Sequence, residues 1–486
     1  MTPATLVTLA PVVPLAGALL IWLSDRRPNL RETITLLTAG ATFLCVAALL
    51  PAVMAGERPA TAWIELLPGL TIAFEVEPLG MLFGLIASFL WIPNSLYSIG
   101  YMRAHHERNQ TRFYTCFAIA IGSALGIAFS GNLLTLFVFY EILTLSTFPL
   151  VTHAGTQEAV RSGRIYLGIL MGTSIGLLLL AIVWTFNATG TLDFRQGGIL
   201  DGVAPGLVPV LLALYVFGVG KAAVMPFHRW LPAAMVAPTP VSALLHAVAV
   251  VKAGVFTVLK IVVYVFGLDL MQTVQPGGWI MWVAAFTVLA ASLIAYTRDN
   301  LKARLAYSTV SQLSYIVLGA LMATGSGIVG GGLHILMHAF GKITLFFCAG
   351  AIIITAHKEK VSEMRGIGRA MPLTMFAFLL GSLSIIGLPP FGGSWSKWYL
   401  MLGALDAGMI ALMAVFMISS LLNIAYLLPI VVRAYFPGRA PTAFDDGLSE
   451  APLLCLIPLL FTALAGVALF AYPDPFYRLL MQLAEP

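Results

Sequence analysis

Hydrophobic positions form long runs along this chain, and short polar connections separate them. Because about 20 consecutive apolar residues cross a bilayer as a helix, the runs predict about fourteen spans. We expect them at residues 4–23, 33–54, 78–100, 112–130, 132–153, 163–187, 206–229, 240–267, 277–296, 304–323, 329–356, 371–403, 408–433 and 451–472. The pattern therefore predicts an all-α polytopic membrane protein.

Two of these runs are interrupted by residues that a continuous helix excludes. The run at 371–403 is too long for one span and contains two prolines and two glycines near its middle, and the stretch 218–260 contains four prolines. Prolines leave backbone carbonyl groups without a hydrogen-bond donor. Such groups are tolerated at membrane depth only where other protein groups or a water-filled cavity supply donors. We therefore expect the seventh and twelfth helices to be broken, with breaks marked by Pro226, Pro238, Pro240, Pro389 and Pro390.

The chain also contains a candidate internal repeat. Residues 112–267 and 277–433 are nearly equal in length, and each holds five predicted spans, so the second copy would be inverted in the membrane. MPFHRW, at 225–230, returns as PPFGGSW, at 389–395. We predict a three-helix segment at 1–111, two inverted five-helix repeats at 112–267 and 277–433, and a last helix with a short tail at 434–486.

Composition and charge agree with this topology. The 486 residues are 59% hydrophobic and only 10% charged, whereas soluble domains carry about 25% charge. Of 26 Lys and Arg residues, eighteen fall in the odd-numbered connections and three in the even ones or the tail. By the positive-inside rule, the odd connections face the cytoplasm of a bacterial inner membrane and both termini face the periplasm. The net charge of +5 thus reflects topology, and we expect no nucleic-acid partner.

The five remaining basic residues are lysines inside the predicted spans. They are Lys221, Lys252, Lys260, Lys342 and Lys397. Arginine stays charged when buried, whereas a buried lysine can lose its proton, so an all-lysine set suits proton handling. The alternative is that these lysines extend to the membrane surface, and we favour that alternative for Lys260, near the end of its span.

A carboxylate and two histidines complete the candidate site. Glu141 is the one acidic residue well inside a span, where it faces a partner, accepts protons or forms a structural pair. A close pair with Lys221 would stabilise both charges by roughly 4 kcal/mol, and separating the two would release the lysine proton. His334, His338 and Lys342, four residues apart, lie along one helical stripe. A proton relay, helix packing and metal ligation are the alternatives for the histidines, although no other helix supplies further ligands.

Other polar residues are candidates for accessory roles. His246 precedes Lys252, and the hydroxyls of Tyr307 and Ser311 either order water or bond between helices. Four cysteines lie in separate apolar stretches without zinc or iron–sulfur spacing. Dinucleotide and Walker motifs are also absent from the sequence. We expect no metal, no cofactor and no redox centre on this chain.

Several motifs resemble a known family. TPVSALLHAVAVVKAG, NLKARLAYSTVSQLSY, HILMHAFGKITLFFCAG and the glutamate of FVFYEIL are similar to the antiporter-like membrane subunits shared by respiratory complex I, membrane-bound hydrogenases and Mrp-type antiporters. The resemblance implies proton translocation along a central hydrophilic axis, with other integral membrane subunits as partners. The proton-translocating positions that it implies are Glu141, Lys221, Lys252, His334, His338 and Lys397.

The parent complex follows less directly from the motifs. Lys397 and the short tail resemble the D-type subunit of Mrp antiporters, whereas PTPVSALLH resembles the complex I type. We favour a subunit that exchanges Na⁺ for protons. The alternatives are a proton-pumping subunit of a complex I-like NADH:quinone oxidoreductase or hydrogenase, a subunit of an inorganic-carbon uptake complex, and a stand-alone carrier of organic anions.

Overall fold

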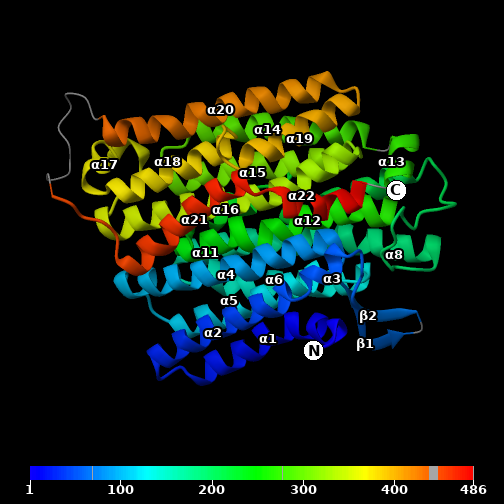
Figure 1. The fold of residues 1–486 in the computed structure, drawn as a ribbon, viewed down its shortest axis with the longest axis horizontal. Coiled ribbons are helices and arrows are strands. Elements are labelled where there is room, and N and C mark those ends of the chain that lie inside the picture. Colours follow the sequence, from blue (N-terminus) through cyan, green and yellow to red (C-terminus); the bar gives the residue numbers. More distant parts are fainter. Residues whose placement is uncertain (68, 276, 437–446, 485–486) are drawn as a thin grey trace.

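The computed structural model describes the chain except residues 68, 276, 437–446 and 485–486. Long helices run side by side along one axis (Figure 1). In the described part of the chain, eleven helical segments are long and apolar enough to cross a membrane. The prediction of an all-α polytopic membrane protein is confirmed, and the predicted loop that follows residue 433 lies largely outside the described residues.

The helices follow the predicted spans in order. The N-terminal segment contains α1 (Pro3–Leu23), α2 (Pro28–Ala47), α3 (Leu50–Met54) and α4 (Pro78–Ala104). The next five spans contain α5 (Gln110–Ala128), α6 (Leu133–Val151), α7 (Gln157–Thr173), α8 (Leu179–Thr189), α9 (Val208–Gly218), α10 (Trp230–Ala233), α11 (Thr239–Ala243) and α12 (Val250–Ile261). The following residues form α13 (Leu268–Val274), α14 (Gly278–Thr297), α15 (Leu301–Leu321), α16 (Gly325–Ala356), α17 (Ile367–Ala370), α18 (Pro372–Ile386), α19 (Gly393–Asp406) and α20 (Ile410–Tyr435). The last helices are α21 (Leu453–Ala471) and α22 (Asp474–Ala484).

The two predicted helix breaks are present. One break separates α9 from α10, and the other separates α18 from α19. Each contains a cis peptide bond, at Met225–Pro226 and at Pro389–Pro390. Because these two spans and α15 fall outside the eleven long apolar segments, the exact count of fourteen spans stays a prediction, as does the division into inverted repeats.

Two of the predicted breaking prolines have a different role. Pro238 directly precedes α11, and Pro240 lies in the first turn of that helix. Proline is favoured in a first turn because its missing N–H has no intrahelical partner there. These two prolines therefore mark the start of a helix and do not interrupt one.

A β-hairpin was not predicted from the sequence. β1 (Ala60–Leu67) and β2 (Leu70–Glu75) pair antiparallel, with Ala60 opposite Glu75. The hairpin lies at one end of the bundle, and the N-terminus and the C-terminal end of α22 lie toward the same end (Figure 1). Phe74 bridges to Ser130, so the hairpin covers the turn between α5 and α6.

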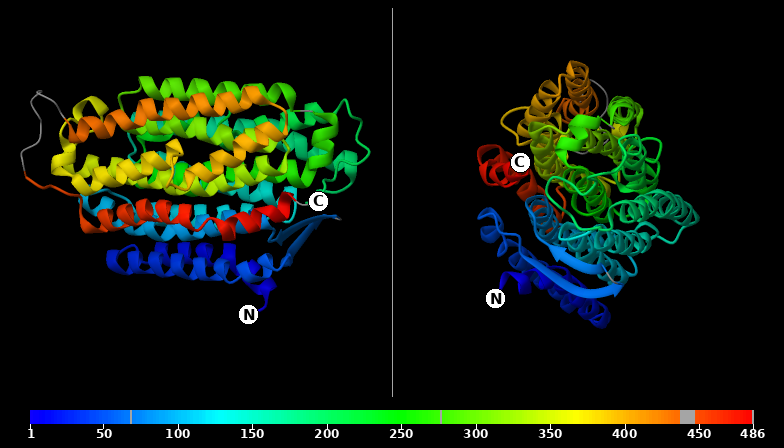
Figure 2. Two further views of the ribbon diagram at one scale, coloured as in Figure 1. Left: turned by 45° about the horizontal axis from the view of Figure 1, so that its top comes forward. Right: turned by 90° about the vertical axis from the view of Figure 1, so that its right-hand side faces the viewer.

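The core of the bundle is built around α16 and the helix that contains α11 and α12. α16 packs against α4, α12, α15, α18, α19 and α21, and α21 packs between α4 and α16 (Figure 2). Gly330 on α16 lies against the backbone of Leu400 on α19, where a side chain would collide. Small residues of this kind let membrane helices approach closely. α16 also packs directly against α12, so the helices that carry His338 and Lys252 are in contact in the interior.

Candidate functional site

The first helix break places Lys221 in the protein interior. α9 ends at Gly218, and Lys221 follows in a short 3₁₀ turn. Its Nζ donates to the backbone oxygen of Tyr140 at 2.9 Å and to Oγ1 of Thr144 at 2.5 Å. The same Nζ lies 3.2 Å from the centre of the Tyr140 ring. A carbonyl, a hydroxyl and an aromatic face of α6 therefore surround this fully buried amine.

Glu141 does not form the predicted ion pair with Lys221. Both carboxylate oxygens of Glu141 are buried and have no hydrogen-bond partner among the described residues. Tyr140 and Thr144 share one side of α6, and Glu141 is rotated from Tyr140 by about 100°, because a helix has 3.6 residues per turn. It lies between the side of α6 that faces Lys221 and the side that carries Leu145, which is 54% exposed, and its buried carboxylate acts on Lys221 electrostatically without an ion-pair contact.

A direct hydrogen bond joins Lys252 to His338. Nζ of Lys252, on α12, lies 2.6 Å from Nδ1 of His338, on α16. His334 lies one turn earlier on α16, with its ring centre 5.8 Å from that of His338. Nδ1 of His334 lies 2.9 Å from Oγ of Ser396 on α19. Three residues that the sequence predicts for the site are thus brought together, beside the helix that carries Lys397.

The second helix break positions Lys397. This lysine lies on α19, and its Nζ donates to the backbone oxygen of Ile386, the last residue of α18, at 2.9 Å. It also donates to Oγ of Ser420 on α20 at 3.0 Å. Lys397 lines a cavity of 450 Å³ together with residues of the break, including Leu388 and Pro389. The amine therefore bridges the two halves of the broken helix and faces open space.

Tyr315, which was not among the predicted site residues, connects the histidines to Lys397. Its ring stacks on His334, with centres 5.5 Å apart, and its centre lies 5.1 Å from Nζ of Lys397. The signal was available, because Ser308, Gln312 and Tyr315 follow a helical spacing of four and three residues. This polar stripe faces the core along α15.

The lysine at the other end of this stripe is Lys342. Its Nζ donates to Oγ of Ser308 at 2.7 Å, so Ser308 is the hydroxyl that contacts the predicted relay. The two accessory hydroxyls predicted on α15 lie elsewhere. Tyr307 packs against Arg298, and Ser311 bonds with Ser292 at 2.9 Å.

His246 lies on a polar route from a surface cavity. It falls in a π-helical segment, Leu244–Val248, between α11 and α12, and both ring nitrogens are buried without a partner in the described chain. The hydroxyls of Thr239 and Ser242, earlier on the same helix, are buried and unpartnered as well. A cavity of 590 Å³, lined by Lys302 among others, adjoins the start of this helix at Pro238. Buried polar atoms of this kind typically bind water.

Lys260 does not extend to the membrane surface, so the interpretation that we favoured for it is wrong. It is fully buried, and its Nζ lies 3.2 Å from Oε1 of Glu77. Glu77 caps α4 by accepting from the backbone N–H of Leu79 and Gly80. The position of this carboxylate at the helix start draws the lysine inward, toward a buried ion pair.

Comparison with known proteins places this arrangement in a family. The family model described as NADH:quinone oxidoreductase/Mrp antiporter, TM, matches residues 130–423, which include Glu141 to Lys397. The chain belongs to this family. It is 33% identical over 434 residues to NADH-quinone oxidoreductase subunit N of Desulforudis audaxviator, covering 85% of both chains. It is 31% identical over 419 residues to NAD(P)H-quinone oxidoreductase chain 5 of Synechocystis, covering 80% of this chain and 60% of that one.

Solved structures share the complete fold of this family member. A chain of the Mrp complex from Dietzia sp. DQ12-45-1b superposes with a TM-score of 0.88 at 23% identity, covering 100% of this chain and 97% of that one. A chain of an archaeal membrane-bound sulfane sulfur reductase superposes with a TM-score of 0.86 at 24% identity, covering 98% and 97%. The resemblance inferred from the motifs is thus confirmed. The protein is an antiporter-like, multi-pass membrane subunit whose relatives belong to multi-subunit complexes.

Proposed function

We propose that this family member carries protons through the bacterial inner membrane along its buried lysines and histidines, as one subunit of a multi-subunit complex. The observation that supports this function best is the connected series Lys252, His338, His334, Tyr315 and Lys397. Ionisable groups at membrane depth are expensive, and they typically mark ion or proton paths. Amines and imidazoles can both accept and release a proton, so a series of them can pass protons onward.

The two cavities define the ends of the proposed route. The 590 Å³ cavity lies beside connections that the basic residues predict to face the cytoplasm, and the unpartnered atoms of Thr239, Ser242 and His246 lead inward from it. The 450 Å³ cavity at Lys397 is the proposed outlet. With this orientation, both termini of the chain face the periplasm.

Glu141 and Lys221 form the proposed switch. Lys221 is held by neutral groups of α6, and the buried Glu141 carboxylate lies near it, beside the exposed face of that helix against which a neighbouring membrane subunit would pack. A cation on that neighbour would compete with Lys221 for the Glu141 carboxylate and so favour loss of the lysine proton. A transmembrane potential supplies about 2.3 kcal/mol per charge per 100 mV, which is comparable with the roughly 4 kcal/mol of a close charge pair. Potential can therefore bias the switch.

The test uses the native complex in sealed vesicles with a pH-sensitive dye. Lys252→Met removes a titratable group from the series and preserves much of its volume, so we expect proton flux to fall to the background level while the complex assembles. A Lys360→Met variant, altered at an exposed position of a connection that does not line the inlet cavity, is the matched control and should retain most of the flux. Equal flux in wild-type and assembled Lys252→Met vesicles would refute the route.

For the driving reaction we propose exchange of Na⁺ for protons, which the lysine at position 397 favours. The second candidate is a redox-driven pump, which the 33% identity to an oxidoreductase subunit favours. The same vesicles separate the two. A Na⁺ pulse should move protons without any reductant under exchange, whereas only NADH or another electron donor should do so in a redox-driven pump.

A further inference from the structure

A polar pocket at one end of α1, α2, α4 and α5 takes no part in the proposed proton route. Its volume is 830 Å³, and its lining includes Trp22, Asp25, Arg31, Thr115 and Cys116. The pocket lies at the connections between α1 and α2 and between α4 and α5, which the basic residues predict to face the cytoplasm. It is therefore placed at the level of the lipid headgroups.

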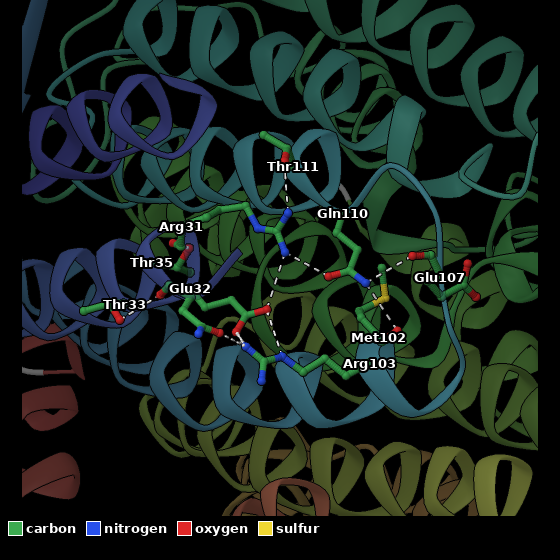
Figure 3. Close-up of polar contacts among 10 residues, drawn as sticks. Arg31, Glu32, Thr33, Thr35, Met102, Arg103, Glu107, Gln110 and Thr111 are labelled. Atoms are coloured by element: carbon green, nitrogen blue, oxygen red, sulfur yellow. Dashed lines mark hydrogen bonds and ion pairs between the residues drawn. The ribbon is translucent and has the colours of Figure 1, made fainter. Parts of the chain in front are cut away.

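A network of charged side chains forms one wall of the pocket (Figure 3). Arg31, which is 4% exposed, donates to Thr111 at 3.0 Å and to Gln110 at 2.9 Å, and its guanidinium lies 3.4 Å from Glu32. Arg103 pairs with the same carboxylate. Because two guanidinium groups share one carboxylate, this wall is locally positive.

Two donors in the pocket have no acceptor. Nε of Arg31 and Oγ1 of Thr115 are both buried and lack a hydrogen-bond partner among the residues that the structure describes. A buried donor without a partner costs about 1–3 kcal/mol, so such groups are normally satisfied. Both belong to residues that line the pocket. An anionic oxygen bound between them would satisfy both.

The charge of the whole lining selects the kind of anion. Three guanidinium groups and three carboxylates line the pocket, namely those of Arg31, Arg103, Arg112, Asp25, Glu32 and Glu107. A ligand with net negative charge would meet carboxylates as well as arginines. A zwitterion that carries a phosphate and an ammonium group matches both.

We propose that this pocket binds the headgroup of a phospholipid with a primary amine, such as phosphatidylethanolamine. The phosphate accepts from Nε of Arg31 and from the Thr115 hydroxyl, and the ammonium group faces the Asp25 carboxylate. Trp22, which is 60% exposed, and Leu23, which is 65% exposed, flank the pocket on α1 and offer an apolar surface to the acyl chains. Exposed tryptophan is typical of the membrane interface. This site is independent of the proposed proton route.

The first experiment measures lipid retention by the native complex. The complex is stripped in detergent, reloaded from vesicles of phosphatidylethanolamine or phosphatidylglycerol, and weighed by native mass spectrometry. Thr115→Val removes one donor at nearly constant volume, so we expect phosphatidylethanolamine to bind about tenfold more weakly. Thr33→Val, on the exposed side of α2, is the matched control and should leave binding unchanged.

The second experiment monitors the pocket without a substitution in its wall. Cys116 lines the pocket, so phosphatidylethanolamine vesicles should slow its labelling by a maleimide in a Cys45→Ser complex, whereas vesicles of phosphatidylglycerol should protect it less. Asp25→Asn should remove this preference. Equal protection by both lipids would overturn the zwitterion assignment. Protection by inorganic phosphate alone, or cross-linking of Cys116 to a neighbouring subunit with no lipid retained, would overturn the lipid site.

Discussion

The two broken helices each position a lysine, but the surroundings of the two amines differ. Lys221 lies inside the first break and is fully buried, and its Nζ donates to Tyr140 and Thr144 of α6. Lys397 lies one turn beyond the second break, contacts the end of α18 and faces a cavity. A helix break therefore places one lysine amine in a closed site and the other beside a cavity. We infer that the sealed amine suits a switch and the accessible amine suits an outlet.

The partners of the two lysines support this distinction. Lys397 donates to the oxygen of Ile386, a terminal carbonyl of α18 that no later turn of the helix uses. The negative end of the helix dipole favours a cation there. Lys221 donates to the oxygen of Tyr140, inside α6, where Thr144 also donates to the same oxygen. Its charge is therefore less well stabilised, and it depends more on Glu141 nearby.

The largest expected effect comes from removing the sealed amine. Lys221→Met should abolish proton flux in vesicles that contain the native complex, because no neighbouring group can replace a titratable amine inside the break. The amount of assembled complex, measured on a native gel, should stay within a factor of two, because methionine has a similar length and, being apolar, leaves no unpaired charge in the buried site. Normal flux in the assembled variant would remove Lys221 from the switch.

The next effect tests the link between the two predicted repeats. Lys252→Ala and His338→Ala each remove one partner of the 2.6 Å contact, and each should lower flux on the order of 10²–10⁴-fold, the range for a positioned proton-transfer group. If the two residues act as one link, the double variant should be no slower than the slower single variant. Multiplied losses in the double variant would show that they act on separate routes.

Much of this arrangement could be predicted from the sequence, because prolines, lysines and basic connections carry strong signals in an apolar chain. The two breaks and the cluster of Lys252, His334 and His338 follow from such signals. The rotation of each helix could not be predicted in this way. Spans that are apolar on every side give no indication of which face meets a neighbour. The position of Glu141, between the buried and the exposed sides of α6, and the contact of Tyr315 with His334 depend on that rotation.

Contacts between segments that are distant in the sequence were a second source of error. Lys260 lies near the end of its span, so composition alone favours an exposed amine, and only the fold brings it to Glu77. The hairpin of β1 and β2 pairs locally within a connection between spans, but its position against the bundle depends on the bridge of Phe74 to Ser130, which is distant in sequence. Contacts between distant segments decided both cases.

The third prediction separates the outlet amine from a structural one. Lys397→Arg keeps the charge but should lower flux by about 100-fold, because guanidinium releases a proton about two orders of magnitude less readily than an ammonium group. Lys260→Met, by contrast, should leave flux nearly unchanged and lower the thermal stability of the complex, because it removes one partner of a buried ion pair. The reverse pattern, with flux lost only at position 260, would exchange the two roles.

The smallest expected effects come from removing the hydroxyl groups that accept hydrogen bonds from the two lysine amines. Thr144→Val removes the hydroxyl that binds Lys221, and in a sealed site no water can take its place, so we expect proton flux to fall about tenfold. Ser420→Ala removes the hydroxyl that binds Lys397 beside the 450 Å³ cavity, which as the proposed outlet would hold water, and a bridging water is nearly as favourable as a direct hydrogen bond. We therefore expect a much smaller loss for Ser420→Ala. Both losses are measured in the same vesicles. Equal losses would mean that water reaches the first break as readily as the second. Lys221 would then be another relay position with no special role as a switch.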